Sequence, residues 1–160
     1  ERHNGFLAID NQNVEAYLQT TQKAKAEHVA AYLMSLVFVY LSKGKTNLTF
    51  FLDNARTHKK KMKGLLNEYL EMFGVKEKVK IEFEHIPPYS PAMNAAEYFI
   101  QLIRKKFLKN IPPNLSIEQV VDGLIPKVQG QALLTPEQMS NIIRRIKRIH
   151  TLRNATPIVE

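Results

Sequence analysis

The chain of 160 residues contains no cysteine. Disulfide bonds and thiolate metal sites are therefore excluded, and carboxylates and histidines remain as the side chains able to bind a metal. Long hydrophobic runs are also missing. The most apolar run, Val29–Leu41, has 13 residues, whereas a membrane-spanning helix needs about 20. Neither a signal peptide nor a membrane span is expected.

Acidic residues are fewer than basic ones: 15 Asp and Glu stand against 23 Lys and Arg, for a formal net charge of +8. The excess lies mostly between Tyr98 and Arg153, where ten basic residues face three acidic ones. Such a basic half suits a polyanion such as nucleic acid, and a solvated basic surface explains it equally well. The length and the apolar content of 44% predict one globular domain.

The first apolar segments predict a β-hairpin. Phe6–Ile9 and Val14–Thr20 flank the turn cluster DNQN, which contains Asp10. A turn position is the favoured interpretation of Asp10, and a metal ligand at a strand end is the alternative. Helical spacing of apolar residues then predicts a helix over Lys25–Ser42.

The following segments predict a strand, a helix and a strand, which together make a βαβ unit. Leu48–Leu52 is apolar without alternation, as is typical of a strand buried on both faces. Lys59–Phe73 is an amphipathic helix with Gly74 as its stop, and Val79–Phe83 alternates like a strand. The residues expected on the buried side of that helix are Met62, Leu65, Leu66, Tyr69, Leu70 and Phe73.

Three prolines, the last of them Pro91, exclude regular structure up to Asn94, which is a good N-cap for a helix over Ala95–Lys109. Glu97 lies in the first turn of that helix, where the helix dipole favours a carboxylate. A structural capping role is the alternative for Glu97. The expected core stripe of this helix consists of Phe99, Leu102, Ile103 and Phe107.

Two more helices are predicted after the sequence IPPN. One covers Ser116–Val128 and is capped by Ser116; the other covers roughly Pro136–Leu152 and is capped by Thr135. The second helix is expected to bury Met139, Ile142, Ile143, Ile146 and Ile149 and to expose Arg144, Arg145, Lys147 and Arg148. Phosphate contact and simple solvation are equally good explanations of the basic face.

Asp53 follows an apolar strand, and carboxylates at the carboxyl ends of strands are common in active sites. Two converging carboxylates can hold Mg²⁺ or Mn²⁺, and such ions support phosphodiester cleavage. A local cap is the alternative for Asp53. His58 is a candidate to contact a phosphate or to orient a ligand. A surface position without such a role is the alternative. Tyr89 and Ser90 are candidates for phosphate or base contacts, with packing as the alternative for Tyr89.

The segments LDNARTHK and PPYSPAMNAAEYF, in this order, resemble two motifs of the DDE superfamily transposases, and most closely those of bacterial insertion-sequence enzymes related to the mariner-like group. The motif D-N-x-x-x-H matches Asp53, Asn54 and His58. The motif P-P-Y-S-P-x-L-N-P-x-E matches Pro87, Pro88, Tyr89, Ser90, Pro91, Asn94 and Glu97. Departures from the motif are Met93, Ala95, Ala96 and Ile100.

The resemblance implies an α/β RNase H-like fold, in which a mixed sheet carries helices on both faces. It makes residues 1–110 the catalytic core and 111–160 a basic helical C-terminal extension of the same domain. It further implies that Asp53 and Glu97 are catalytic ligands of Mg²⁺ or Mn²⁺ in DNA cleavage and strand transfer.

Residues expected to support the ligands or contact phosphate are Asn54, His58, Tyr89, Ser90 and Asn94. Residues expected to contact double-stranded DNA at transposon ends are Arg104, Lys105, Lys106, Arg144, Arg145 and Arg148. The location expected for such an enzyme is the bacterial cytoplasm, at the nucleoid when bound to DNA.

The family's first catalytic Asp lies on a central strand upstream of the hairpin. Because the chain starts at Glu1, that strand and its Asp are expected to be missing, and the chain alone is expected to be inactive or nearly so. Strand edges left without a partner then predict a homodimer, a separate upstream segment, a strand rearrangement or marginal stability. The alternatives are a non-catalytic DNA-binding or interaction remnant of a transposase and a different nuclease on the same fold.

Overall fold

The computed structural model of the chain forms two compact units. The residues that it describes are 4–10, 16–21, 23–53, 55–86, 95–109, 111–128 and 134–155. Thr21–Tyr89 form the central unit, and Glu1–Thr20 together with Ser90–Glu160 form the terminal unit. The names central unit and terminal unit refer only to where these residues lie in the sequence.

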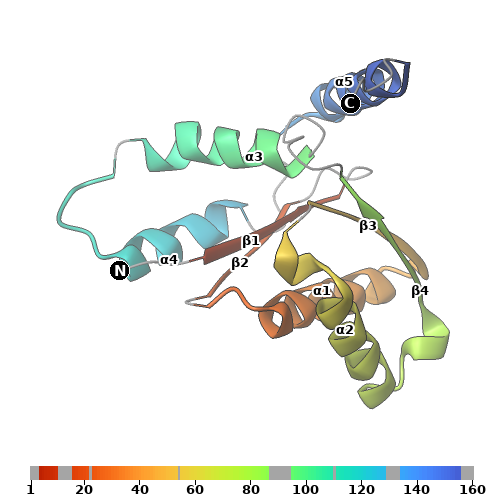
Figure 1. Ribbon diagram of the computed structural model, residues 1–160. Helices are drawn as coiled ribbons and strands as arrows, with labels where there is room; N and C mark the ends of the chain where they lie inside the picture. The colour runs from red at the N-terminus through yellow and green to blue at the C-terminus, as the bar shows by residue number, and fades with distance from the viewer. Residues whose placement is uncertain are drawn as a thin grey trace. The chain divides into compact units, whose positions relative to one another are not determined.

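The central unit combines two long helices with one pair of strands (Figure 1). Its elements are α1 (Ala26–Ser42), β3 (Asn47–Leu52), η1 (Arg56–His58), α2 (Lys60–Met72), η2 (Lys76–Lys78) and β4 (Lys80–His85). The helices α1 and α2 lie side by side and contact each other. Both helices predicted for this region are confirmed, with ends within one residue of the predicted ones.

Strands β3 and β4 pair in parallel, from Asn47 opposite Lys80 to Leu52 opposite His85. Parallel neighbours need a crossover connection, and the segment with α2 provides it. Residues at alternate positions share a face, so the rings of Phe50 and Phe83 meet with centroids 6.0 Å apart. The predicted βαβ unit is confirmed.

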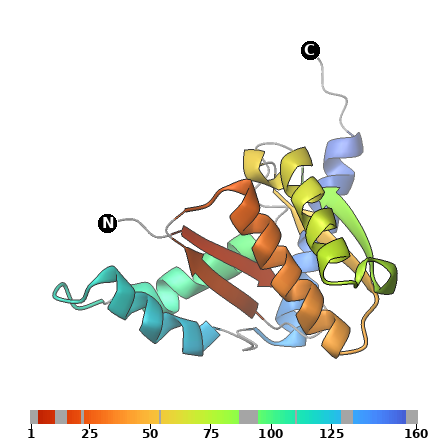
Figure 2. The ribbon, with the colours of Figure 1, turned by 90° about the horizontal axis from the view of Figure 1, so that it is seen from below.

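The prediction that β3 is buried on both faces is wrong. Leu48 and Phe50 are partly buried and Leu52 is buried, whereas Phe51 on the opposite face remains 65% exposed. The reason is visible in Figures 1 and 2: α1 and α2 both lie on one side of the β3–β4 pair, and no described element of the central unit covers the other side.

The core of the central unit lies between α1 and α2. Helix α2 buries Met62, Leu66 and Leu70 toward α1. Phe73 was predicted to be buried, but it is 56% exposed because it lies beyond the last residue of α2. Its ring meets the ring of Phe38 edge-on, with centroids 5.3 Å apart. Gly74 has φ = +67°, a conformation that glycine adopts without steric cost, so the predicted stop is confirmed.

The terminal unit contains one pair of strands and several helical segments. Its elements are β1 (Asn4–Ile9), β2 (Ala16–Thr21), α3 (Ala95–Ile103), the π-helical segment η4 (Arg104–Leu108), α4 (Ile117–Val128) and α5 (Pro136–Ala155). The predicted pairing of the first two strands is confirmed, and Asp10 directly follows β1. The helix predicted from Ala95 widens at Arg104 into the π-helical turn η4.

Helix α3 provides the core of the terminal unit. Phe99 is fully buried against Met139 of α5, and Ile103 is buried against Val128 of α4. Partly buried Leu7 and Ile9 of β1 pack against both clusters. The predicted stripe of α3 is therefore correct. In α5, Met139 is buried as predicted and Ile142, Ile143 and Ile146 are partly buried; the side chain of Ile149 lies outside the described residues.

Helices α4 and α5 begin with reciprocal caps. The Ser116 hydroxyl accepts a hydrogen bond from the Gln119 backbone N–H, and the Gln119 side chain accepts one from the Ser116 N–H. Thr135 and Gln138 repeat this arrangement at α5. Both predicted caps are confirmed, because each satisfies backbone donors that a helix start leaves unpaired.

The structure is mixed α/β, as predicted. The described strands form two separate two-stranded sheets, β1–β2 and β3–β4, rather than one mixed sheet. No described strand bonds to both pairs, so the ladders do not join. Among the described helices, none has the length and apolar character that crossing a membrane requires.

Candidate active site

Asp53 lies directly after β3, at the carboxyl end of the parallel strand pair. The Ile86 backbone N–H donates a hydrogen bond of 2.7 Å to the Leu52 carbonyl, which ties the ends of the two strands together. Side chains that follow parallel strands gather at such an edge. The predicted strand-end position of Asp53 is therefore confirmed.

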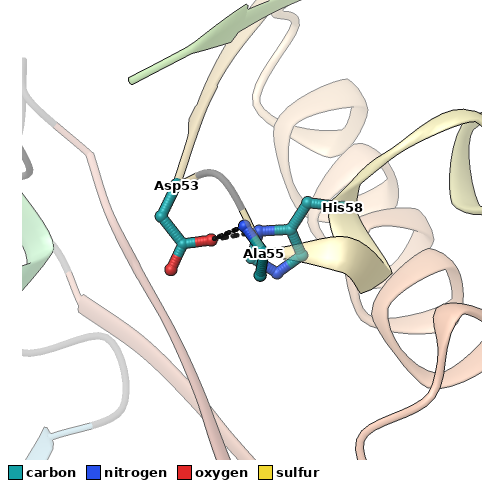
Figure 3. A network of polar contacts seen from close by, with 3 residues as sticks. All are labelled: Asp53, Ala55 and His58. Atoms are coloured by element: carbon teal, nitrogen blue, oxygen red, sulfur yellow. Dashed lines mark hydrogen bonds and ion pairs between the residues drawn. The ribbon is translucent and has the colours of Figure 1, made fainter. Parts of the chain in front are cut away.

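Two groups hold one oxygen of the Asp53 carboxylate (Figure 3). The Ala55 backbone N–H donates to Oδ1 over 3.0 Å, and Nδ1 of His58 lies 2.7 Å from the same oxygen. The Ala55 contact is the local turn that aspartate commonly forms with the backbone two residues on. In Figure 3 the other carboxylate oxygen points away from both groups. Asp53 is thus oriented through one oxygen and offers the second.

The contact between Asp53 and His58 is short, but its alignment departs from that of a regular hydrogen bond. Nδ1 of His58 is buried and has no well-aligned hydrogen-bond partner among the described residues, yet the carboxylate oxygen is only 2.7 Å away. Electrostatic attraction persists at this distance even where the alignment is imperfect. The attraction requires a proton on Nδ1.

The pKa of the Asp53 carboxyl lies below its ordinary value of 3.8. The His58 side chain is the largest cause. Partial burial acts in the opposite direction, while the Ala55 N–H and the charges of His58 and His85 lower the pKa further. The carboxylate form of Asp53 is therefore stabilised.

His58 ends the short helix η1, which contacts both α1 and α2. Its side chain is 20% exposed, compared with 50% for Asp53. Packing thus fixes the histidine, and the histidine in turn restrains the more exposed carboxylate. A lone histidine before a helix does not reveal this contact in the sequence.

His85, which was not among the predicted site residues, ends β4 opposite Leu52, and its charge acts on Asp53. In the sequence, His85 comes two residues after the predicted strand Val79–Phe83, and Asp53 comes directly after the predicted strand Leu48–Leu52. Once two strands are taken as a parallel pair, their next polar residues belong to the same edge.

Glu97 lies in the first turn of α3, as predicted, and is partly buried. Phe99, two residues later in the helix, is fully buried and anchors this part of α3. Glu97 belongs to the terminal unit and Asp53 to the central unit. That the carboxylates of Asp53 and Glu97 bind the same cation remains a proposal.

The chemistry of Asp53 fits a hard divalent cation, because its carboxylate is ionised and one oxygen is available. Within the described residues, however, no group of three or more His, Asp or Glu side chains is close enough to form a complete metal site. Asn54, Tyr89, Ser90 and Asn94 lie outside the described residues.

The predicted DNA-contact residues are exposed on two segments of the terminal unit. Arg104, Lys105 and Lys106 lie on η4, and Arg144, Arg145 and Arg148 lie on α5. Because these side chains are exposed, their charges are accessible to a polyanion such as DNA. A basic surface that contacts only solvent would be exposed in the same way. Their contact with DNA remains a prediction.

A family profile described as DDE superfamily endonuclease matches residues 1–116. No curated protein sequence matches the chain. The matched region contains Asp53, His58 and Glu97 and covers well over half of the chain. Endonucleases of this superfamily act on DNA and generally use divalent metal ions. The chain belongs to the DDE superfamily of endonucleases.

Proposed function

We propose that this chain is the catalytic domain of a DDE-type transposase of the bacterial insertion-sequence kind, which cleaves DNA phosphodiester bonds and transfers the cut strand. The observation that carries the proposal is the Asp53 carboxylate, oriented by His58 at the carboxyl end of a parallel strand pair. Residues 1–110 form its catalytic core, and residues 111–160 form a basic helical extension. Such a protein works in the bacterial cytoplasm, where the DNA is.

Asp53 and Glu97 are the proposed metal ligands. Asp53 presents one oxygen while Ala55 and His58 hold the other. Helix α3 presents Glu97 from its first turn, close to the positive end of the helix dipole. Mg²⁺ or Mn²⁺ bound there would supply activation of water and stabilisation of the leaving oxygen.

His58 is a positioning residue in this scheme, because it acts on the cation through Asp53. Asn54, Tyr89, Ser90 and Asn94 are proposed to support the ligands or contact phosphate. The basic residues of η4 and α5 are proposed to contact the backbone of double-stranded DNA. Phosphate contacts of this kind give affinity and orientation without sequence preference.

A complete site usually needs at least a third acidic group. We propose that a second copy of the chain or a separate segment supplies this third acid. Metal binding is therefore a better first test than catalysis, because two carboxylates suffice to bind a cation weakly.

The test is titration with Mn²⁺, followed by electron paramagnetic resonance, together with nicking of supercoiled plasmid DNA. Asp53→Asn and Glu97→Gln should each weaken Mn²⁺ binding at least about tenfold and abolish any metal-dependent nicking. Asp122→Asn and Glu118→Gln, in exposed positions of α4, are matched controls that should change neither. The metal-site proposal fails if both site variants bind Mn²⁺ and cut DNA like the parent.

A non-catalytic DNA-binding remnant is the second candidate function. The observation that favours it is the exposure of basic side chains on η4 and α5, which requires no carboxylate. In that case Asp53→Asn and Glu97→Gln would leave all measurable properties unchanged, while DNA binding would weaken steeply with added salt. A flat salt response would contradict phosphate contacts in either function.

A further inference from the structure

A groove of about 780 Å³ runs along the first half of α2 in the central unit and is open to solvent. The residues that line it are Lys59, Lys60, Lys63, Gly64, Asn67 and His85. Three are lysines and none is acidic. The groove therefore combines concave shape with concentrated positive charge.

Helical spacing explains why these side chains meet. Lys60, Lys63, Gly64 and Asn67 are three or four residues apart, so they follow one side of α2. The neighbouring side of the helix is buried, which keeps the lysines from turning inward. Lys63 also places its ammonium group 5.0 Å from the centre of the Phe83 ring, which joins α2 to the strand that ends at His85.

Strand β4 directs its two glutamates away from this groove. Lys63 meets Phe83 on the helix-covered face of β4, and strand alternation places His85 on that same face. Glu82 and Glu84 alternate to the opposite, exposed face. Among the described residues, neither Lys59 nor Lys60 forms an ion pair with an acid. Within the part of the chain that the structure describes, the charges of these two lysines are thus not compensated by an ion pair.

The start of α2 carries charges of the locally unfavourable sign. Lys59 is the N-cap, Lys60 and Lys61 follow, no side chain caps the helix, and its first turn has no acid. A helix start prefers negative charge, with each unfavourable cation costing roughly 0.3–1 kcal/mol when exposed. Helix starts with free N–H groups and added lysines favour bound anions. A local violation of this kind often marks a functional site.

The groove lies beside the Asp53 edge of the sheet. His85 forms part of its wall, pairs across the sheet with Leu52 and acts electrostatically on Asp53. All of these residues belong to the central unit. An anion in the groove would therefore lie near the proposed ligand without depending on the terminal unit.

We propose that the groove between α2 and the end of β4 binds the phosphate backbone of DNA and directs one strand toward Asp53. Lys60 and Lys63 neutralise adjacent phosphates, Lys59 adds a third positive charge to the groove, and His85 lies at the side of the groove toward Asp53. This proposal rests on the proposed function, and it adds a DNA path distinct from the basic residues of η4 and α5.

The first experiment measures the affinity of a short fluorescent DNA duplex by anisotropy over a range of salt concentrations. Lys60→Gln combined with Lys63→Gln should lower the affinity up to about tenfold per lysine near 0.1 M salt and reduce the salt slope by about one per lysine. Lys78→Gln is the control, because Lys78 is exposed in the central unit, as Lys60 is, but lies outside the groove.

Gly64 provides an independent test inside the groove. A side chain added there meets no atom within 4 Å at its first carbon, so substitutions are compatible with the fold. Gly64→Glu should weaken duplex binding several-fold more than Gly64→Gln, since the two differ in charge and barely in shape. Equal affinities of these two variants would count against phosphate in the groove.

Acetylation footprinting separates this proposal from the proposed function. DNA should protect Lys60 and Lys63 from acetylation but leave Lys78 reactive. Unprotected groove lysines in a chain that binds DNA and Mn²⁺ would overturn the groove and leave the proposed function standing. No duplex binding by the parent would overturn both. Protection of the groove with no metal binding would support the groove and reject the metal-dependent function.

Discussion

Oδ1 of Asp53 lies 2.7 Å from Nδ1 of His58, across the turn that joins β3 to α2. The mostly buried ring, packed near α1, therefore limits the motion of a half-exposed carboxylate. Because the Asp53 side chain is already restrained, it loses less conformational entropy when it binds a cation.

Removal of the His58 ring should weaken the metal site without unfolding the protein. We expect His58→Ala to lower Mn²⁺ affinity about 10–100-fold, the usual cost of losing a group that orients a ligand. The free energy of unfolding should change by less than about 1 kcal/mol, because the pair is partly exposed. Titration with Mn²⁺ and urea denaturation measure the two effects.

His28→Ala is a suitable control for this variant. His28 accepts a hydrogen bond from the Lys25 backbone N–H at the start of α1, so its loss should affect stability and leave Mn²⁺ affinity unchanged. His58→Gln, which retains a donor, should recover part of the affinity. Equal Mn²⁺ affinities of parent and His58→Ala would exclude a positioning role for His58.

The Asp53 contact should stabilise the fold in a pH-dependent manner. Its pKa is lowered on folding, so the stabilisation is fully present above the unfolded-state pKa of about 3.9 and is lost as the pH falls through the lower folded-state value. The effect should be below about 1 kcal/mol, because Asp53 is half exposed. Urea denaturation of the parent and Asp53→Asn should show a stability difference near pH 6 that shrinks below about pH 4. A difference that grows toward acid pH would contradict the lowered pKa.

Gly64→Ala should stabilise the protein by roughly 0.5–1 kcal/mol, because alanine is the better helix former and the new methyl group meets no neighbour within 4 Å. Gly74→Ala should do the opposite, since Gly74 has φ = +67°, which strains other residues. Thermal or urea denaturation of both variants checks the pair. Destabilisation by Gly64→Ala would mean that the groove side of α2 is packed rather than open.

Phe99→Ala should destabilise the terminal unit by about 3–5 kcal/mol, the usual cost of removing a buried aromatic side chain. Phe99 is fully buried between α3 and α5. Phe51→Ala is the matched control and should change stability little, because Phe51 is 65% exposed. Similar losses for both variants in urea denaturation would show that the β3 face is covered in solution.

Local features of the chain were predictable because they depend on residues close in sequence. The caps at Ser116 and Thr135 need only the reach of a hydroxyl to the next turn, and Gly74 needs only freedom at φ. The βαβ unit also followed from pattern alone, since a short strand, an amphipathic helix and another strand have few ways to pack. These features placed Asp53 after a strand and Glu97 at a helix start.

Contacts between distant residues were not predictable from these patterns. The apolar run NLTFFL reads as a doubly buried strand, yet its exposure depends on which elements cover each face, and Phe51 faces away from both helices. Phe73 similarly continues the apolar stripe of α2 but lies beyond its last turn.

The sequence by itself determined the family, the order of helices and strands, and the two acids expected to act. The tertiary structure decided that His58 holds Asp53, that His85 ends the neighbouring strand beside it, and that the lysines of α2 share one groove. The physical reason is that caps, turns and periodicity come from neighbouring residues. An ion pair, a strand register or a groove instead depends on how separate elements pack in three dimensions.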